Sequence, residues 1–165
     1  MGLGFGDGSG TGIGEVESDM LIVIVLVAAT LVARLIGAEW VAFLNSWPAA
    51  TRAGLAVMLL FTGSAHFNSM RHDLARMVPR AIPNAMGMVY FTGVCEILGA
   101  IGLLVPATRL AATIALIVMF VALLPANIRA ALEGMTLRGK PVTPLVWRVP
   151  MQIVFVALTW WAGTR

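Results

Sequence analysis

Two side chains in this sequence could exchange protons, namely the imidazole of His66 and the carboxyl group of Glu96. These are the residue types most used for general acid–base chemistry. Both lie in stretches that are otherwise apolar. A polar group in an apolar segment costs free energy unless it has a partner or a role. We therefore take His66 and Glu96 as the candidate catalytic residues.

Each of these residues also has a structural interpretation. Glu96 could be a buried carboxyl paired with Arg148 or His66 rather than an acid or base. His66 could make a structural hydrogen bond, take part in acid–base chemistry, orient a ligand, or bind a metal or haem. A metal would need more ligands, and the nearby Cys95 faces a different direction on the same helix. We therefore predict no metal site.

Further polar residues in or beside apolar segments are candidate ligand-binding groups. Arg148 and Gln152 are four residues apart, so they share one helix face. Asn127 follows Pro125, which removes one backbone donor, so its side chain could instead satisfy the freed carbonyl nearby. The full set of candidate ligand-binding residues is Tyr90, Thr92, Asn127, Arg148 and Gln152.

Two threonines stand one helical turn before the candidate acid–base residues. Thr62 precedes His66 by four residues, and Thr92 precedes Glu96 by the same interval. Their hydroxyl groups could be hydrogen-bond partners of the acid–base pair, or they could bond to their own backbone.

The composition indicates an integral membrane protein. Of the 165 residues, 59% are hydrophobic and 12% are charged, and the mean hydropathy is +0.92. A soluble domain is about 45–50% apolar and about 25% charged. The apolar stretches are continuous rather than alternating, which favours helices over barrel strands. The net charge of +3 comes from basic residues in loops, so we predict no nucleic-acid partner.

The predicted fold class is an all-α integral membrane protein. It has a four-helix transmembrane bundle and an additional N-terminal transmembrane helix. We predict a flexible Gly-rich tail over residues 1–19 and a single transmembrane helical domain over 20–165. A short interfacial helix over 71–80 is expected to end at Pro79 and Pro83. The predicted spans cover residues 20–37, 52–67, 84–105, 108–127 and 147–162.

The loop charges predict an orientation. With five spans, the tail, the segment 69–83 and the loop 128–146 share one side. Seven basic residues fall on that side (Arg71, Arg76, Arg80, Arg129, Arg138, Lys140 and Arg148) and four on the other (Arg34, Arg52, Arg109 and Arg165). The positive-inside rule places the seven in the cytoplasm. The N-terminus is therefore expected inside and the C-terminus outside.

This topology brings the polar candidates to the same half of the membrane. His66 and Asn127 end their helices on the inner side, and Arg148 with Gln152 begin the last helix there. Glu96 lies deeper, at about 18 Å from the inner start of its helix at 1.5 Å per residue. The outer halves contain almost no strongly polar side chain. We therefore predict one shared polar site that opens to the inner leaflet.

Five short motifs in order carry a family resemblance. They are Gly63-x-x-His66-Phe67, Met77-Val78-Pro79 with Pro83, Tyr90-x-Thr92-Gly93-x-x-Glu96-x-x-Gly99, Pro125-Ala126-Asn127 and Arg148-x-Pro150-x-Gln152. Together, over about residues 52–163, they resemble the DoxX family of small bacterial membrane proteins. The resemblance implies a four-helix core, a location in the bacterial cytoplasmic membrane and an association with quinone-linked oxidoreduction.

Three functions follow as alternatives. The first is a subunit or accessory of a quinone-linked oxidoreductase, with quinone as the ligand and a redox protein as partner. The second is a stand-alone intramembrane enzyme that acts on a lipophilic small molecule, with Glu96 and His66 as the proton-transfer pair. The third is a structural or scaffolding membrane protein. The lipid bilayer is a partner in all three, and the sequence is also compatible with a homo-oligomer.

Overall fold

The computed structural model describes residues 13–165 of the chain, with side chains from Met20 onward. It is helical throughout apart from one two-stranded hairpin, so the predicted all-α class is confirmed. The elements are α1 (Ile13–Glu39), η1 (Ala42–Leu44), α2 (Trp47–Ala65), α3 (Arg71–Met77), α4 (Ala85–Leu104), α5 (Arg109–Leu132), β1 (Thr136–Leu137), β2 (Lys140–Pro141) and α6 (Leu145–Thr164).

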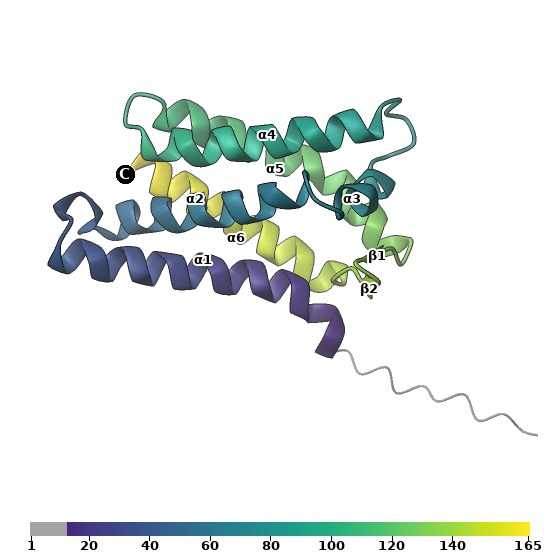
Figure 1. The fold of residues 1–165 in the computed structure, drawn as a ribbon, viewed down its shortest axis with the longest axis horizontal. Helices are drawn as coiled ribbons and strands as arrows, with labels where there is room; N and C mark the ends of the chain where they lie inside the picture. Colours follow the sequence, from purple (N-terminus) through teal and green to yellow (C-terminus); the bar gives the residue numbers. More distant parts are fainter. Residues whose placement is uncertain (1–12) are drawn as a thin grey trace, which may run out of the picture.

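The five long helices share one core. α2 packs against α4 and α6, and α5 packs against the same two helices from the other side. α1 lies along the outer face of α2, as Figure 1 shows. Buried residues from all five long helices meet in this core, among them Leu26, Leu55, Leu103, Leu116 and Ala162. α2 contacts three long helices, α1, α4 and α6, and is the central one.

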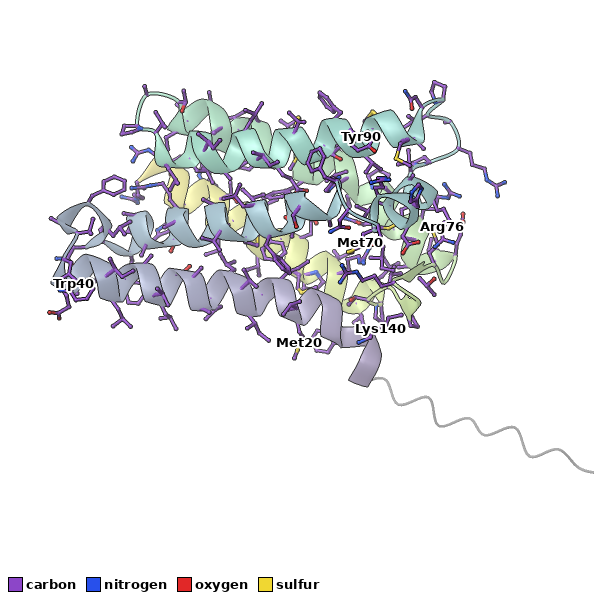
Figure 2. All side chains as sticks on the ribbon, in the orientation of Figure 1. Met20, Trp40, Met70, Arg76, Tyr90 and Lys140 are labelled. Carbon is purple, nitrogen blue, oxygen red and sulfur yellow. The ribbon has the colours of Figure 1, made fainter. Side chains whose placement is uncertain are left out.

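The two ends of the bundle differ (Figure 1). One end holds α3 and the β1–β2 hairpin, and we call it the hairpin end. The other holds η1, the α4–α5 turn and the C-terminus, and we call it the C-terminal end. Figure 2 shows Arg76 and Lys140 at the hairpin end and Trp40 at the C-terminal end. The segments 69–83 and 128–146, which were predicted to share one side, therefore lie together.

Several helix boundaries differ from the predicted ones. α1 begins at Ile13, earlier than the expected Met20, and the rest of the predicted tail, residues 1–12, lies outside the described residues. α2 begins at Trp47 rather than Arg52. Ser46 caps it by accepting a hydrogen bond from the Ala49 amide at 3.3 Å, and proline follows at a first-turn position. Both features are typical of a helix start.

The predicted loop over 128–146 is shorter than expected, because α5 continues past Pro125 to Leu132. The remaining segment forms the hairpin, in which Leu137 pairs with Lys140. Arg138 and Gly139 form its two-residue turn with φ values of 52° and 75°. Positive φ at both central positions matches the right-handed twist of the flanking strands.

Most of the exposed side chains along the bundle are apolar. They follow helical spacing on the outward faces of α1, α4, α5 and α6, for example Ile24, Leu31, Phe91, Leu98, Ile114, Val118, Val121, Ile153 and Val154. Buried polar residues lie inside, including Arg52, His66, Glu96 and Arg148. This distribution reverses that of a soluble protein, in which such large exposed apolar surfaces are rare.

Four helices are long and apolar enough to cross a membrane within the described part of the chain. They are residues 20–39 of α1, and α4, α5 and α6. α2 has 19 residues but carries more polar side chains, among them Thr51, Arg52 and Thr62. About half of α2 is buried by its neighbours. The structure therefore contains four apolar candidates rather than the five expected, with α2 enclosed among three of them.

Candidate functional site

His66 ends α2 and is buried against α4. It follows Ala65 directly, and its side chain is 8% exposed. Gly93 of α4 lies beneath it, because a β-carbon built on Gly93 would come 2.5 Å from the β-carbon of His66. Real β-carbons do not approach this closely. Glycine at position 93 therefore allows α2 and α4 to approach where the histidine is held.

The Nδ1 atom of His66 carries a hydrogen. It lies 2.7 Å from the carbonyl oxygen of Val89, which can only accept. The Thr92 hydroxyl lies 3.2 Å from the same nitrogen and about equally near to two backbone carbonyls of its own helix. This bond to Val89 fixes both the orientation of the ring and its tautomer. The Nε2 atom is thereby directed at Glu96.

The Nε2 atom of His66 faces Oε1 of Glu96. The two atoms are 3.4 Å apart, and both side chains are about nine-tenths buried. Because Nδ1 donates to the Val89 carbonyl, Nε2 is the ring nitrogen that can exchange a proton with the carboxyl group. The separation is slightly longer than a strong hydrogen bond of about 2.7–3.2 Å.

The second oxygen of Glu96 bonds to α2. The Thr62 hydroxyl lies 2.6 Å from Oε2 and also within reach of the carbonyls of Met58 and Leu59. A hydroxyl group has one proton, so it donates either to the carboxyl or to its own helix. Thr62 therefore has both kinds of partner that were considered for it, its own backbone and the acid–base pair, in which it contacts Glu96 rather than His66. Both oxygens of the Glu96 carboxyl group therefore contact side chains at the C-terminal end of α2, Oε1 that of His66 and Oε2 that of Thr62.

Arg148, Gln152 and Asn127 form a second cluster between α5 and α6. Arg148 donates to the side-chain oxygen of Asn127 at 3.2 Å. Gln152 donates to the Phe120 carbonyl at 2.6 Å, one turn before Pro125. Asn127 was expected to satisfy the backbone freed by this proline, but its oxygen accepts from Arg148. Arg148 and Gln152 act from one face of α6, as their spacing predicts.

The predicted single site is thus divided over two helix interfaces. His66, Glu96 and Thr92 meet between α2 and α4, whereas Asn127, Arg148 and Gln152 bond across α5 and α6. Glu96 pairs with His66, which was one of the two partners considered for it. Sequence spacing placed five of these groups, all but Thr92, in the same half of the membrane, with Glu96 deeper than the other four. It could not show which helices are neighbours, and that decides which groups touch.

Tyr90 lies on the surface beside the first cluster. Figure 2 shows it on the outward side of α4, and it is 39% exposed. Its ring stacks on Phe67 with centroids 5.9 Å apart. Phe67 in turn lies close to Gly93. The two rings therefore form an aromatic cover next to His66.

Two cavities lie at the hairpin end, of about 420 Å³ and 210 Å³. α3 contributes to the lining of both. Neither lining includes His66 or Glu96. The expected continuity between an open pocket and the acid–base pair is absent from these two cavities.

Arg52 is a functional candidate that the sequence placed at the outer start of the span 52–67, among the four basic residues of that side. It is 6% exposed inside α2, and its guanidinium donates to the Ala162 carbonyl at 2.7 Å near the end of α6. The C-terminal half of the bundle therefore does contain a strongly polar group, contrary to expectation. The Ser46-Trp47-Pro48 sequence is a helix-start signal that would have placed Arg52 inside the helix.

Comparison with known proteins gives a family but no activity. Neither a curated protein nor a solved structure matches the sequence. Residues 55–163, which hold both polar clusters and most of the bundle, match a family defined by its sequence. The chain therefore belongs to the family described as Domain of unknown function (DUF8561).

Proposed function

We propose that this chain is an integral protein of the bacterial cytoplasmic membrane with five spans, α2 being the fifth. The apolar outward faces of α1, α4, α5 and α6 support this location. Exposed tryptophans near the ends of the bundle support it too, because tryptophan prefers the membrane interface. These are Trp40, Trp47, Trp147, Trp160 and Trp161. Contacts with neighbouring helices shield the polar side chains of α2 from lipid.

The basic residues at the hairpin end favour a cytoplasmic N-terminus and an external C-terminus. In a Cys95→Ala background, single cysteines at Arg138→Cys and Glu39→Cys report the two ends. An impermeant maleimide should label Glu39→Cys in intact spheroplasts and Arg138→Cys only after permeabilisation. Labelling of both positions from the same side would contradict five spans, and the reverse pattern would invert the orientation.

We infer that the His66–Glu96 pair exchanges protons with a quinone, as part of a DoxX-like subunit or accessory of a quinone-linked oxidoreductase. The observation that carries this inference is the 3.4 Å approach of Nε2 and Oε1, on two buried side chains at a helix interface. Quinone reduction consumes two electrons and two protons. The electrons would come from a redox partner protein, and the pair would supply or accept the protons.

The residues around the pair are compatible with a quinone head group. Nε2 and Oε1 can each donate or accept, which suits the two carbonyl oxygens of a quinone and the two hydroxyls of its reduced form. The aromatic cover of Phe67 and Tyr90 offers an apolar surface next to them. The separate Arg148–Asn127 cluster contributes no direct contact to the pair through the bonds described above.

Replacing Glu96 with glutamine tests this function. The amide retains a hydrogen-bonding group for Thr62 and His66 but cannot release a proton at neutral pH. In the native host, the wild-type gene should restore quinone-linked electron flow to a deletion strain, and Glu96→Gln should not. Glu133→Gln removes an exposed carboxyl and should restore it fully. Unchanged electron flow in the deletion strain would refute the proposal.

A scaffolding function is the second candidate, and one observation favours it. The atoms of His66 and Glu96 are bonded within the protein, and neither of the two cavities reaches them. If the protein is a scaffold, Glu96→Gln lowers the free energy of unfolding by the contribution of the lost carboxyl contact and leaves electron flow intact. The same complementation experiment therefore separates the two functions.

A further inference from the structure

The larger cavity at the hairpin end lies apart from the His66–Glu96 site. Its volume of about 420 Å³ lies within the range of about 300–1,000 Å³ that is common for ligand pockets. It is bounded by α3, by the segment that leads from α3 to α4, and by the last turn of α5. Its lining combines the arginines Arg76, Arg80 and Arg129 with Glu133 and apolar residues such as Ile82 and Met135.

One wall of this cavity is held rigidly. Arg129 donates to both oxygens of Glu133, at 2.8 Å and 3.2 Å, and to the Val78 carbonyl at 2.6 Å. The hydrogen bond from Arg129 lowers the pKa of Glu133, so this carboxyl stays ionised at neutral pH. These bonds tie α5 to the segment after α3. The Arg129–Glu133 pair therefore holds this wall in place before a ligand binds, and the pair itself adds no net charge.

The other two arginines leave positive charge for a ligand. Arg76 pairs with Asp73 at 2.6 Å but is 65% exposed in its side chain. Arg80 is exposed and forms no salt bridge within the part of the chain that the structure describes. Three guanidinium groups and one carboxylate line the cavity, and with Asp73, which pairs with Arg76, the local net charge is +1. An anion that binds here gains donors without breaking the Arg129–Glu133 pair.

The cavity stands where the basic end of the bundle meets its apolar flank. Leu132 is next to Glu133 in sequence and is 72% exposed, and the lining itself includes Val78, Ile82 and Met135. A soluble anion would gain nothing from this apolar surface. A ligand with a phosphate on one side and hydrocarbon on the other would use both.

We propose that this cavity binds the phosphate group of an anionic phospholipid, with Arg80 and Arg76 as the donors. The acyl chains then follow the apolar flank that begins at Leu132. Basic pockets at the cytoplasmic surface of membrane proteins suit such head groups, because arginine forms strong charge-assisted bonds to phosphate. This inference rests on the membrane location in the proposed function but not on any role of His66 or Glu96.

Native mass spectrometry of the detergent-purified chain tests the site. The probes are dioleoyl phosphatidylglycerol and dioleoyl phosphatidylcholine at equal concentrations, with inorganic phosphate as a soluble competitor. The wild-type chain should retain phosphatidylglycerol in preference to phosphatidylcholine. Arg80→Gln should weaken that binding about tenfold, the loss expected for one charge-assisted bond. Arg80→Lys should restore part of it.

Arg138→Gln is the matched control, since it removes the same charge from the same end but lines neither cavity. It should change the affinity less than about twofold, as expected for an exposed charge. Equal losses in Arg80→Gln and Arg138→Gln would indicate diffuse attraction and overturn the proposal. So would Arg80-dependent binding of inorganic phosphate without preference for phosphatidylglycerol, which would indicate a soluble ligand. This assay contains no quinone and tests no residue of the His66–Glu96 pair, so failure here is separable from failure of the quinone site.

Discussion

Replacing His66 with alanine should lower the free energy of unfolding by about 3–5 kcal/mol, because it leaves Glu96 buried without its partner and opens a cavity between α2 and α4. Two contacts disappear together, the 2.7 Å bond to the Val89 carbonyl and the 3.4 Å contact to Glu96. SDS titration of the purified chain in mixed micelles measures the change. His66→Ala should unfold at a clearly lower SDS fraction than the wild type.

A double-mutant cycle separates the interaction free energy between His66 and Glu96 from the general loss of packing. His66→Ala and Glu96→Ala should couple by about 1–3 kcal/mol, since residues in direct contact do not contribute independently. His66→Gln places an amide near the Nε2 position and should recover more stability than His66→Asn, whose shorter amide reaches only toward Val89. Additive losses in the cycle would show that the two side chains do not interact.

Replacing Gly93 with alanine should lower the free energy of unfolding by about 1–3 kcal/mol, the range for overpacking a tight interface. The new methyl group would meet the β-carbon of His66 at 2.5 Å and the Phe67 ring at 3.0 Å. The helices must separate, so the contact between Nε2 and Oε1 should also lengthen. Gly93→Ala should therefore impair quinone-linked electron flow as well as stability.

Gly63→Ala is the matched control on the facing helix. Its new methyl group would lie 3.4 Å from Ile97 and 3.5 Å from the Glu96 β-carbon, which are ordinary contacts. Alanine also favours a helix over glycine by about 1 kcal/mol. Gly63→Ala should be neutral or stabilising in the same SDS titration. Equal destabilisation by both substitutions would mean that the close approach at Gly93 is not specific.

The helices were predictable because their apolar runs are long and because few polar residues interrupt them. The helix end was less predictable, since the predicted span already contained Pro125 and α5 continues from Asn127 to Leu132. The hairpin was missed because its strands have only two residues each and its turn depends on positive φ at Arg138 and Gly139. A short pairing of this kind leaves no periodic pattern in the sequence.

The acid–base pair was predictable in part. A buried carboxyl needs a partner, and His66 was one of the two groups considered for Glu96. The division into two clusters was not predictable, because it depends on α2 packing against α4 while α5 packs against α6. The burial of Arg52 was missed for a local reason, since the cap at Ser46 extends α2 by five residues beyond the predicted start.

The binding of a quinone at the His66–Glu96 pair is best tested by equilibrium titration of the purified chain with decylubiquinone in nanodiscs. The wild-type chain should bind saturably. Glu96→Gln should weaken binding at least about tenfold, the loss expected for one strong hydrogen bond to a charged group. Glu133→Gln should leave binding unchanged. Absence of saturable binding, or equal affinity in the wild type and Glu96→Gln, would contradict a quinone site at this pair.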